Sequence, residues 1–452
     1  MSAQVERTTQ ISSSSHAPTV HTEEVLSSKY TPLLRVWSEV IMPFLVIRLL
    51  LFVVGIVTVY YILPLVNRNQ PVFPGARLSH FPDMLFLMWD RFDSGFYLSI
   101  AHDGYWGPET LHGMSTWAFF PLYPLLIRLI ASPFGSTMDT YRVIGIIISN
   151  SAALVAATYL YKLTTREFNH TIAARTIFYF ALFPLSFYLS AIYPEALFIA
   201  FIVSCVYYTR LHRWWLASLL GGLAALTRPQ GTLLVIVIGW EYWQVLADHY
   251  APLSPTTGIV AQTREWLRSR FLGLLRSLAS WRTWLGFVAL ALVPTGFVLF
   301  CLYAKWKVGS FLAFEKVELY GWGRHFTNPL ILLQNMITHP LPASPYDWNF
   351  YGLNVIVIFA FLLLLIPIFR RLPVIYGIFA LAFCLMPITS GVPNGVARYY
   401  LEVFPAFMFL AWWSSQGSQE QQMRRHTLIV SSFAVLLSLG MTLFTLGVYS
   451  MQ

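Results

Sequence analysis

The sequence predicts an all-α membrane protein that crosses the bilayer many times, as a bundle of about 11 transmembrane helices. Of its 452 residues, 57% are hydrophobic and only 11% are charged, and its mean hydropathy is +0.60. Soluble domains carry roughly 25% charged residues. Apolar stretches such as 43–65, 285–303 and 353–369 meet or approach the about 20 residues that a spanning helix needs, and similar stretches recur along the whole chain.

The positive charges lie in short connectors between the apolar stretches, so we read the net charge of +9 as membrane topology and not as a nucleic-acid partner. Because Lys and Arg are enriched in cytoplasmic loops, these connectors predict the cytoplasmic face and a cytoplasmic N-terminus. The membrane would be the plasma membrane in a prokaryote and the endoplasmic reticulum membrane in a eukaryote. The basic connectors are 162–175, 210–213, 264–282, 370–371 and 424–425.

The chain divides into a tail and one membrane domain. Residues 1–35 are rich in Ser, Thr and Glu and have no apolar stretch, which predicts a disordered cytoplasmic tail without a cleavable signal peptide. Residues 36–452 form the membrane domain. Its apolar stretch 121–134 is short, flanked by proline and interrupted by Arg128, so we expect it to be interfacial or re-entrant. Three further segments are expected: a first external loop with amphipathic helices at 66–118, a basic cytoplasmic connector at 246–283 and a second external loop at 307–352.

The first external loop contains two carboxylates three residues apart, Asp90 and Asp93, which are flanked by aromatic residues. Such a pair at a membrane surface suits a general base with a helper acid or a metal ligand. The alternative is a solvated pair in which one carboxylate caps a helix that begins near Ser94. Spacing alone does not decide between the two.

Other polar candidates lie at the entrances of predicted spans on the same face. Glu195 follows Tyr193 and Pro194 at a helix start, where the helix dipole alone would favour a carboxylate. Arg228 and Arg398 lie on the face where the charge bias disfavours arginine, which suits contact with a phosphate or a carboxylate. Pairing of Arg228 with Glu195 is the structural alternative.

Aromatic residues accompany these polar groups on the same face. The segments 119–124 and 312–324 combine Phe, Tyr and Trp with polar side chains, among them Glu315 and Trp322. Flat aromatic rings beside polar groups suit sugar rings, although Trp and Tyr also anchor proteins at the bilayer surface.

Residues 91–105 resemble the R-W-D-x-x-W-Y-L-x-I-A-x-x-G-Y signature of the PIG-V type mannosyltransferases, relatives of GPI mannosyltransferase 2 in the GT-C glycosyltransferase superfamily. Phe92 and Phe96 replace the two signature tryptophans, and Asp93 falls on the acidic position. The resemblance continues, in the order of the family, at 119–124, 193–198, 226–231, 311–322 and 398–399.

The resemblance implies a GT-C type bundle that transfers a mannosyl residue, with inversion, from a polyprenyl or dolichyl phosphate to a glycolipid or glycan acceptor outside the cytoplasm. Asp93 would be the general base, and Asp90 would orient the acceptor or, alternatively, hold a divalent ion. No cofactor is firmly implied. Arg228, Arg398 and Tyr399 would bind the donor phosphate, and the lipid tails would enter laterally from the membrane. The substrate-binding candidates are Tyr97, Tyr123, Tyr193, Glu195, Glu315 and Trp322.

Two rival functions remain at this stage. A lipid or sugar transporter would also have many spans with Arg and Glu within them, although the sequence shows no paired broken helices in matching halves. A catalytically silent scaffold could bind the carrier lipid and would tolerate Asp93→Asn. A zinc site is not predicted, because the histidine pairs His102/His112 and His325/His339 and the three cysteines lack ligand spacing.

Overall fold

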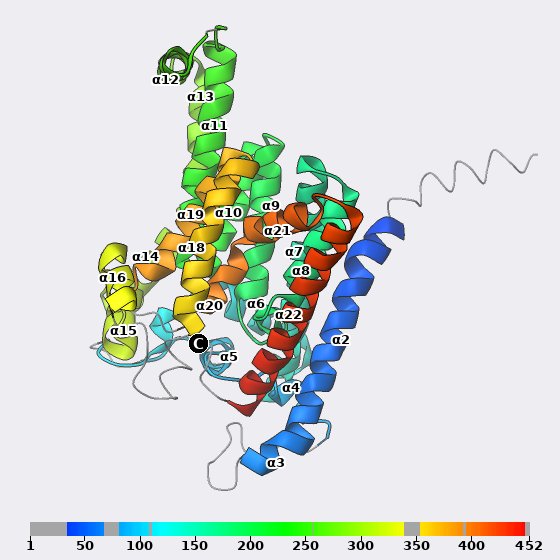
Figure 1. Ribbon diagram of the computed structural model, residues 1–452. Coiled ribbons are helices and arrows are strands. Elements are labelled where there is room, and N and C mark those ends of the chain that lie inside the picture. Colours follow the sequence, from blue (N-terminus) through cyan, green and yellow to red (C-terminus); the bar gives the residue numbers. More distant parts are fainter. Residues whose placement is uncertain are drawn as a thin grey trace, which may run out of the picture.

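The computed structural model describes residues 34–66, 81–107, 111–255, 257–338, 353–391 and 395–447, and every regular element within them is a helix (Figure 1). The expected tail, 1–35, lies outside the described residues except for Leu34 and Arg35, which begin the first helix.

The first half of the described chain contains a long N-terminal helix, two short helices of the first loop and a compact group of bundle helices. These are α2 (Met42–Val57), α3 (Leu63–Val66), α4 (Met84–Leu87), α5 (Ser94–Asp103), α6 (Leu122–Ala131), α7 (Met138–Glu167), α8 (His170–Leu182), α9 (Glu195–Arg210), α10 (Trp214–Thr227) and α11 (Leu234–Tyr250).

The second half adds a projecting helix, the second loop and the remaining bundle helices. These are α12 (Ile259–Ser277), α13 (Trp281–Leu290), α14 (Thr295–Val308), α15 (Ala313–Trp322), α16 (Pro329–Thr338), α18 (Leu353–Arg371), α19 (Val374–Ile388), α20 (Val396–Tyr399), α21 (Phe404–Ser414) and α22 (Gln419–Leu446). A single 3-10 turn, Tyr400–Glu402, joins α20 to α21.

Four helices among the described residues are long and apolar enough to cross a bilayer, and the chain is an integral membrane protein. They are Leu34–Leu65, which includes α2, then α7, the Asn354–Arg371 part of α18, and α22. The helices α13 and α14 form a fifth candidate that is bent by 51°. Five further apolar helices are only 10–17 residues long, so the predicted number of about 11 spans is not confirmed.

Proline residues account for several of the differences from the predicted spans. Pro184 follows α8, so the helix predicted to run to residue 192 ends at Leu182. Pro294 lies at the bend between α13 and α14, within the single span predicted from 284 to 303. Pro disfavours a helical conformation of the residue before it and cannot donate a backbone hydrogen bond. These breaks produce short helices where apolar content alone predicts continuous ones.

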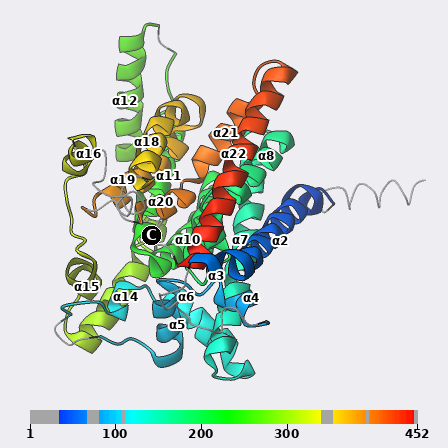
Figure 2. The same ribbon diagram turned by 60° about the horizontal axis from the view of Figure 1, so that its bottom comes forward.

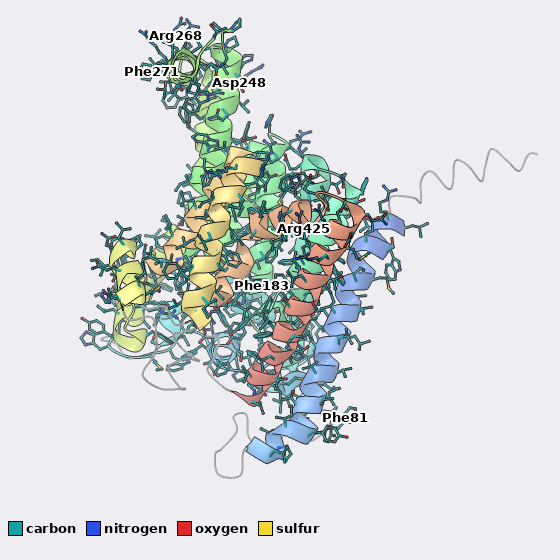
Figure 3. The ribbon with its side chains drawn as sticks, viewed as in Figure 1. Phe81, Phe183, Asp248, Arg268, Phe271 and Arg425 are labelled. Atoms are coloured by element: carbon teal, nitrogen blue, oxygen red, sulfur yellow. The ribbon has the colours of Figure 1, made fainter. Side chains whose placement is uncertain are left out.

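The α11–α12 arm and the loop helices lie at opposite ends of the molecule. In Figure 1, α5 and α15 lie toward the lower end, whereas α11 rises from the bundle to α12 at the upper end. Helix α12 is seen nearly end-on beside α11 in Figure 1 and along its length in Figure 2, so it runs across the direction of α11. In Figure 3, Asp248, Arg268 and Phe271 gather at the end of this arm, far from Phe81 of the first loop. The basic connector and the first loop are therefore spatially separated.

A partly buried charge network joins four helices. Arg210 of α9 donates to Glu167 of α7, with its Nε 2.9 Å from Oε1, and also pairs with Glu241 of α11. The hydroxyl of Tyr376 in α19 donates to Glu167 at 2.9 Å. Because a buried charge without a partner is costly, this network fixes the relative positions of the four helices.

Helices α10 and α14 approach closely at two glycines. A Cβ atom built on Gly222 would lie 2.7 Å from the carbonyl oxygen of Leu292, and one on Gly296 would lie 2.0 Å from the carbonyl oxygen of Gly222. Small residues at helix crossings in membrane proteins allow this close backbone packing.

We expect Gly296→Ala to lower the stability of the protein in detergent by about 1–3 kcal/mol, because its methyl group would collide with backbone that cannot move aside. Thermal unfolding of the purified protein measures this change. Gly239→Ala in α11 is the matched control, since its Cβ would meet only the Leu290 side chain at 3.4 Å. Equal unfolding temperatures for the two variants would contradict the close crossing.

Candidate active site

The site begins at a strained turn in the first loop. Phe92 has a φ of 53°, in the left-handed region that a bulky residue rarely adopts. Such a conformation costs of order 1–3 kcal/mol and persists only where the surroundings hold it. The turn places Asp93 at the N-cap position of α5, yet its side chain makes no capping hydrogen bond. Helix capping therefore does not account for Asp93.

The hydroxyl of Tyr193 holds this turn from the side of α9. It accepts a hydrogen bond from the Asp93 backbone N–H at 3.1 Å and donates one to the Arg91 carbonyl oxygen at 2.9 Å. One hydroxyl thus bridges the residues on either side of Phe92. Tyr193 is only 1% exposed, so these two bonds are shielded from water.

The end of α22 supports the same turn from another direction. The buried Arg91 side chain donates through Nη2 to the carbonyl oxygen of Thr445 at 2.6 Å. The ring centroids of Phe92 and Phe444 lie 5.8 Å apart. The conformation that positions Asp93 therefore depends on α9 and α22 as well as on the loop.

The Asp93 carboxylate pairs with an arginine from the far end of the chain. Nη1 of Arg398, in α20, donates to Oδ2 of Asp93 at 2.8 Å. Nε of the same guanidinium lies 3.7 Å from Oε1 of Glu195, the first residue of α9. Arg398 is almost completely buried, whereas the Asp93 side chain is 17% exposed.

A second buried arginine, Arg228, follows α10 and faces two carboxylates. Its Nη1 lies 2.9 Å from Oε1 of Glu195 and 3.0 Å from Oε1 of Glu402. The ring of Tyr399 lies between the two arginines, with its centroid 4.5 Å from the Arg228 Cζ and 5.3 Å from the Arg398 Cζ. An aromatic face attracts cations, so Tyr399 allows two like charges to remain close together.

Helix α15 adds another ion pair beside this cluster. Oε2 of Glu318 lies 3.5 Å from Nη1 of Arg324, just beyond the end of the helix. Burial raises the pKa of the Glu318 carboxyl above its ordinary value, and the charge of Arg324 opposes this rise. The charges of Asp93 and Arg398 also act on Glu318. Helix α15, within the segment predicted to be the second external loop, therefore borders the site.

Several buried polar atoms of the cluster lack hydrogen bonds. Among the described residues, Nε of Arg398 and Oε2 of Glu195 are buried without a hydrogen bond, whereas Nη1 of Arg228 and Oε1 of Glu402 face each other at 3.0 Å in an ion pair. Buried polar groups in proteins are nearly always hydrogen-bonded, and exceptions need an explanation. A polar ligand at this position would supply the missing partners.

Three predicted site residues instead form the packed support of the loop. Asp90 is 2% exposed, and its two oxygens accept from the Ser94 hydroxyl at 2.8 Å and from Nε of Arg142 at 2.7 Å. The Tyr123 hydroxyl bonds to the Gly145 carbonyl and to Ser149. Tyr97 packs against the rings of Phe119, Tyr123 and Tyr193.

The remaining two predicted residues lie on α15. Trp322 contacts Phe96 and Phe119 edge to face, with both centroid distances 5.7 Å, and so forms an aromatic wall beside α5. Glu315 is exposed on the helix surface. The structure therefore brings together Asp93, Tyr193, Glu195, Arg228, Arg398 and Tyr399, and leaves Glu315 outside this group.

Sequence reasoning assigned no role to three members of the cluster: Glu402, Glu318 and Arg324. Glu402 is a carboxylate one turn beyond Arg398 at the start of an apolar stretch, and this unusual placement was the available signal. Glu318 and Arg324 carry no comparable signal, because a polar loop contains many charged residues. Within the described residues, no group of three or more His, Cys, Asp or Glu side chains is placed to hold a metal ion.

Comparison with known proteins identifies the family. The sequence model of the family described as Mannosyltransferase (PIG-V) matches residues 37–279, which is more than half of the chain. The chain is therefore a membrane glycosyltransferase. It belongs to the PIG-V mannosyltransferase family, as the motifs in the first loop predicted. No curated protein is significantly similar to it.

Solved structures with related chain traces are distant. ArnT from Cupriavidus metallidurans bound to undecaprenyl phosphate is 14% identical, with a TM-score of 0.44, and the match covers 89% of this chain and 77% of that chain. The apo oligosaccharyltransferase of Archaeoglobus fulgidus is 12% identical, with a TM-score of 0.44, and the match covers 90% of this chain and 56% of that chain. These similarities are too weak to transfer site roles.

We expect Tyr193→Phe to lower kcat about tenfold or more with little change in KM, because the ring remains but the Phe92 turn loses both hydrogen bonds. The loss of stability should be about 1–3 kcal/mol. Steady-state sugar transfer and thermal unfolding measure the two effects. Tyr208→Phe, which loses a hydroxyl contact with Tyr159 at the other end of α9, is the control. A change in KM alone would instead indicate direct substrate binding by Tyr193.

Asp90→Asn should mainly destabilise the protein, because Arg142 would lose a buried charged partner. Arg142 would keep the more exposed Asp139 as a partner, so we expect a loss of roughly 1–3 kcal/mol in the free energy of unfolding. The double variant Asp90→Asn/Arg142→Gln should recover much of this loss, and a double-mutant cycle measures the coupling. If Asp90→Asn instead abolished transfer at unchanged stability, Asp90 would be a contact of the acceptor.

Proposed function

We propose that this protein transfers a mannosyl residue from a polyprenyl or dolichyl phosphate to a hydroxyl group of a glycolipid or glycan. The supporting observation is the ion pair between Asp93, in the first loop, and the buried Arg398, beside the second buried arginine, Arg228. A carboxylate that can act as a base and cations that suit a phosphate meet in one cluster. Family membership supports the mannosyl group as the transferred sugar.

In the proposed reaction, Asp93 accepts the proton of the acceptor hydroxyl, and the oxygen of that hydroxyl attacks the anomeric carbon of the donor. The bond between this carbon and the phosphate oxygen breaks, and its electron pair leaves with the lipid phosphate. Attack from the face opposite the phosphate inverts the anomeric configuration. A phosphate leaves readily, so the reaction needs no second carboxylic acid of the kind that glycosidases use.

The arginines would stabilise the charge that develops on the departing phosphate. A planar guanidinium donates two parallel hydrogen bonds to phosphate oxygens, and a buried site strengthens this interaction. Nε of Arg398 is buried without a hydrogen bond and would be available for this purpose, whereas Nη1 of Arg228 already lies within 3.0 Å of both Glu195 and Glu402. No metal ion is required in this scheme.

We place the site on the extracytoplasmic side, with the N-terminus in the cytoplasm. The support is the separation of the first loop from the basic α11–α12 arm (Figure 3), combined with the enrichment of positive charge in cytoplasmic loops. The carrier lipid would reach the cluster from the membrane. A transporter could also contain such an ion pair, so it is family membership that favours transfer.

We expect Asp93→Asn to reduce the transfer rate about 10²–10⁴-fold with folding retained, because the amide cannot accept the proton. The measurement uses the purified protein in proteoliposomes with a panel of polyprenyl-phosphate sugars and acceptor glycolipids. Asp103→Asn is the matched control, since Asp103 ends α5 with a side chain that is 61% exposed. Undiminished transfer by Asp93→Asn would overturn the assignment of the base. Absence of transfer by the wild type across the panel would overturn the donor class.

A further inference from the structure

Arg398 is the only cation within hydrogen-bonding distance of Asp93 among the ion pairs of the described residues, and its guanidinium is tightly confined. Its Cζ lies 5.7 Å from the ring centroid of Tyr193 and 5.3 Å from that of Tyr399. Of its three nitrogens, Nη1 donates to Asp93, Nη2 has a long contact of 3.4 Å with the Tyr399 hydroxyl, and Nε has no hydrogen bond. The shortest hydrogen bond of Arg398 is therefore the one to Asp93, the proposed base.

The anions around the two arginines differ in how easily they can leave. Glu195 and Glu402 are each 1% exposed and share Arg228, so separating either of them from arginine would leave a buried, unpaired charge. Asp93 is 17% exposed, so its carboxylate can be solvated or can meet an incoming hydroxyl when its ion pair breaks. Among these three carboxylates, Asp93 is the one that an incoming anion can replace at lowest cost.

A lipid phosphate is suited to this replacement. The donor phosphodiester has two unesterified oxygens, which can accept from Nη1 and Nη2, the two nitrogens at the end of the guanidinium. Such a bidentate contact would replace the single bond of Nη1 to Asp93 and the long contact of Nη2 with the Tyr399 hydroxyl. After transfer the phosphate carries a greater negative charge and would hold Arg398 more strongly. The two anions cannot both occupy Nη1, so binding of one displaces the other.

We propose that the donor phosphate takes Arg398 from Asp93, so that the base becomes free to accept a proton only when the lipid-linked donor is in place. This inference rests on the proposed function. Before the donor binds, the ion pair compensates the negative charge of Asp93 and holds its carboxylate toward Arg398. Donor binding then precedes productive acceptor binding, and Arg398 acts in turn as the partner of the base and of the leaving group.

The exchange predicts that removing the charge of the base strengthens phosphate binding. In Asp93→Asn, Arg398 no longer has to give up a carboxylate, so a sugar-free polyprenyl phosphate should bind about tenfold or more tightly than to the wild type. Binding of the radiolabelled lipid phosphate to the purified full-length protein in detergent measures the dissociation constants. This binding measurement does not require enzymatic turnover. Asp103→Asn on the same helix should bind like the wild type.

Arg398→Gln separates the exchange from simple charge repulsion. If the exchange operates, adding Asp93→Asn to Arg398→Gln changes the dissociation constant less than twofold, because there is no guanidinium to release. A tenfold gain that persists without Arg398 would overturn the exchange and leave repulsion as the cause. Thermal unfolding verifies that each variant is folded, and Arg398→Met takes the place of Arg398→Gln in this comparison if the latter does not fold.

The possible failures are distinguishable. Equal binding by the wild type and Asp93→Asn, or weaker binding by the variant, overturns the exchange but leaves the donor class intact. Absence of saturable binding by every folded variant overturns the exchange together with the polyprenyl-phosphate donor of the proposed function.

Discussion

The cost of burying charge is the constraint on which the rest of this structure depends. Arg228 and Arg398 are buried in the protein interior, and each requires an anion close enough to form an ion pair. The first loop, the start of α9 and the turn before α21 supply these anions as Asp93, Glu195 and Glu402. Segments that are hundreds of residues apart in the sequence must therefore converge at one point. The same convergence assembles the candidate site.

Tyr193 stabilises the strained backbone turn at Phe92. The left-handed conformation of Phe92 is unfavourable by itself, and it is the Tyr193 hydroxyl that bridges its two neighbours. Because Tyr193 precedes Glu195 by two residues, the segment that holds the turn also supplies a carboxylate to both arginines. This short stretch of chain thus contributes both to the position of Asp93 and to the charge balance of the cluster. Strained backbone supported in this way is typical of functional sites.

Much of this site could be predicted from the sequence, but its partnerships could not. The order of the motifs identified Asp93, Arg228 and Arg398, which indeed lie together. Asp90 looks equivalent to Asp93 in the sequence, yet it forms a buried ion pair with Arg142 of α7 and does not join the cluster. Which of two neighbouring carboxylates faces the site depends on the direction of the turn at Phe92. No linear pattern encodes a positive φ at a phenylalanine.

The fold shows the same division between local and distant information. Apolar composition predicts membrane helices well, because burial in lipid demands apolar side chains whatever the tertiary arrangement. Helix continuity was harder to predict. Pro294 produces a 51° bend between α13 and α14, and nearby Gly296 allows α14 to meet α10 at the distance of backbone contact. A proline within an apolar stretch marks where a helix can break, but the neighbouring helix determines whether the break is used.

The incomplete hydrogen bonding of the cluster suits a site that must bind a polar substrate. A fully satisfied network would be more stable, but it would offer no polar atom to a substrate and would resist rearrangement. Here the fixed part is the pairing of Arg228 with Glu195 and Glu402, both almost inaccessible to water. The adjustable part is the pairing of Arg398 with the more exposed Asp93. A rigid ion pair next to an exchangeable one allows the site to keep its shape while one anion is replaced by another.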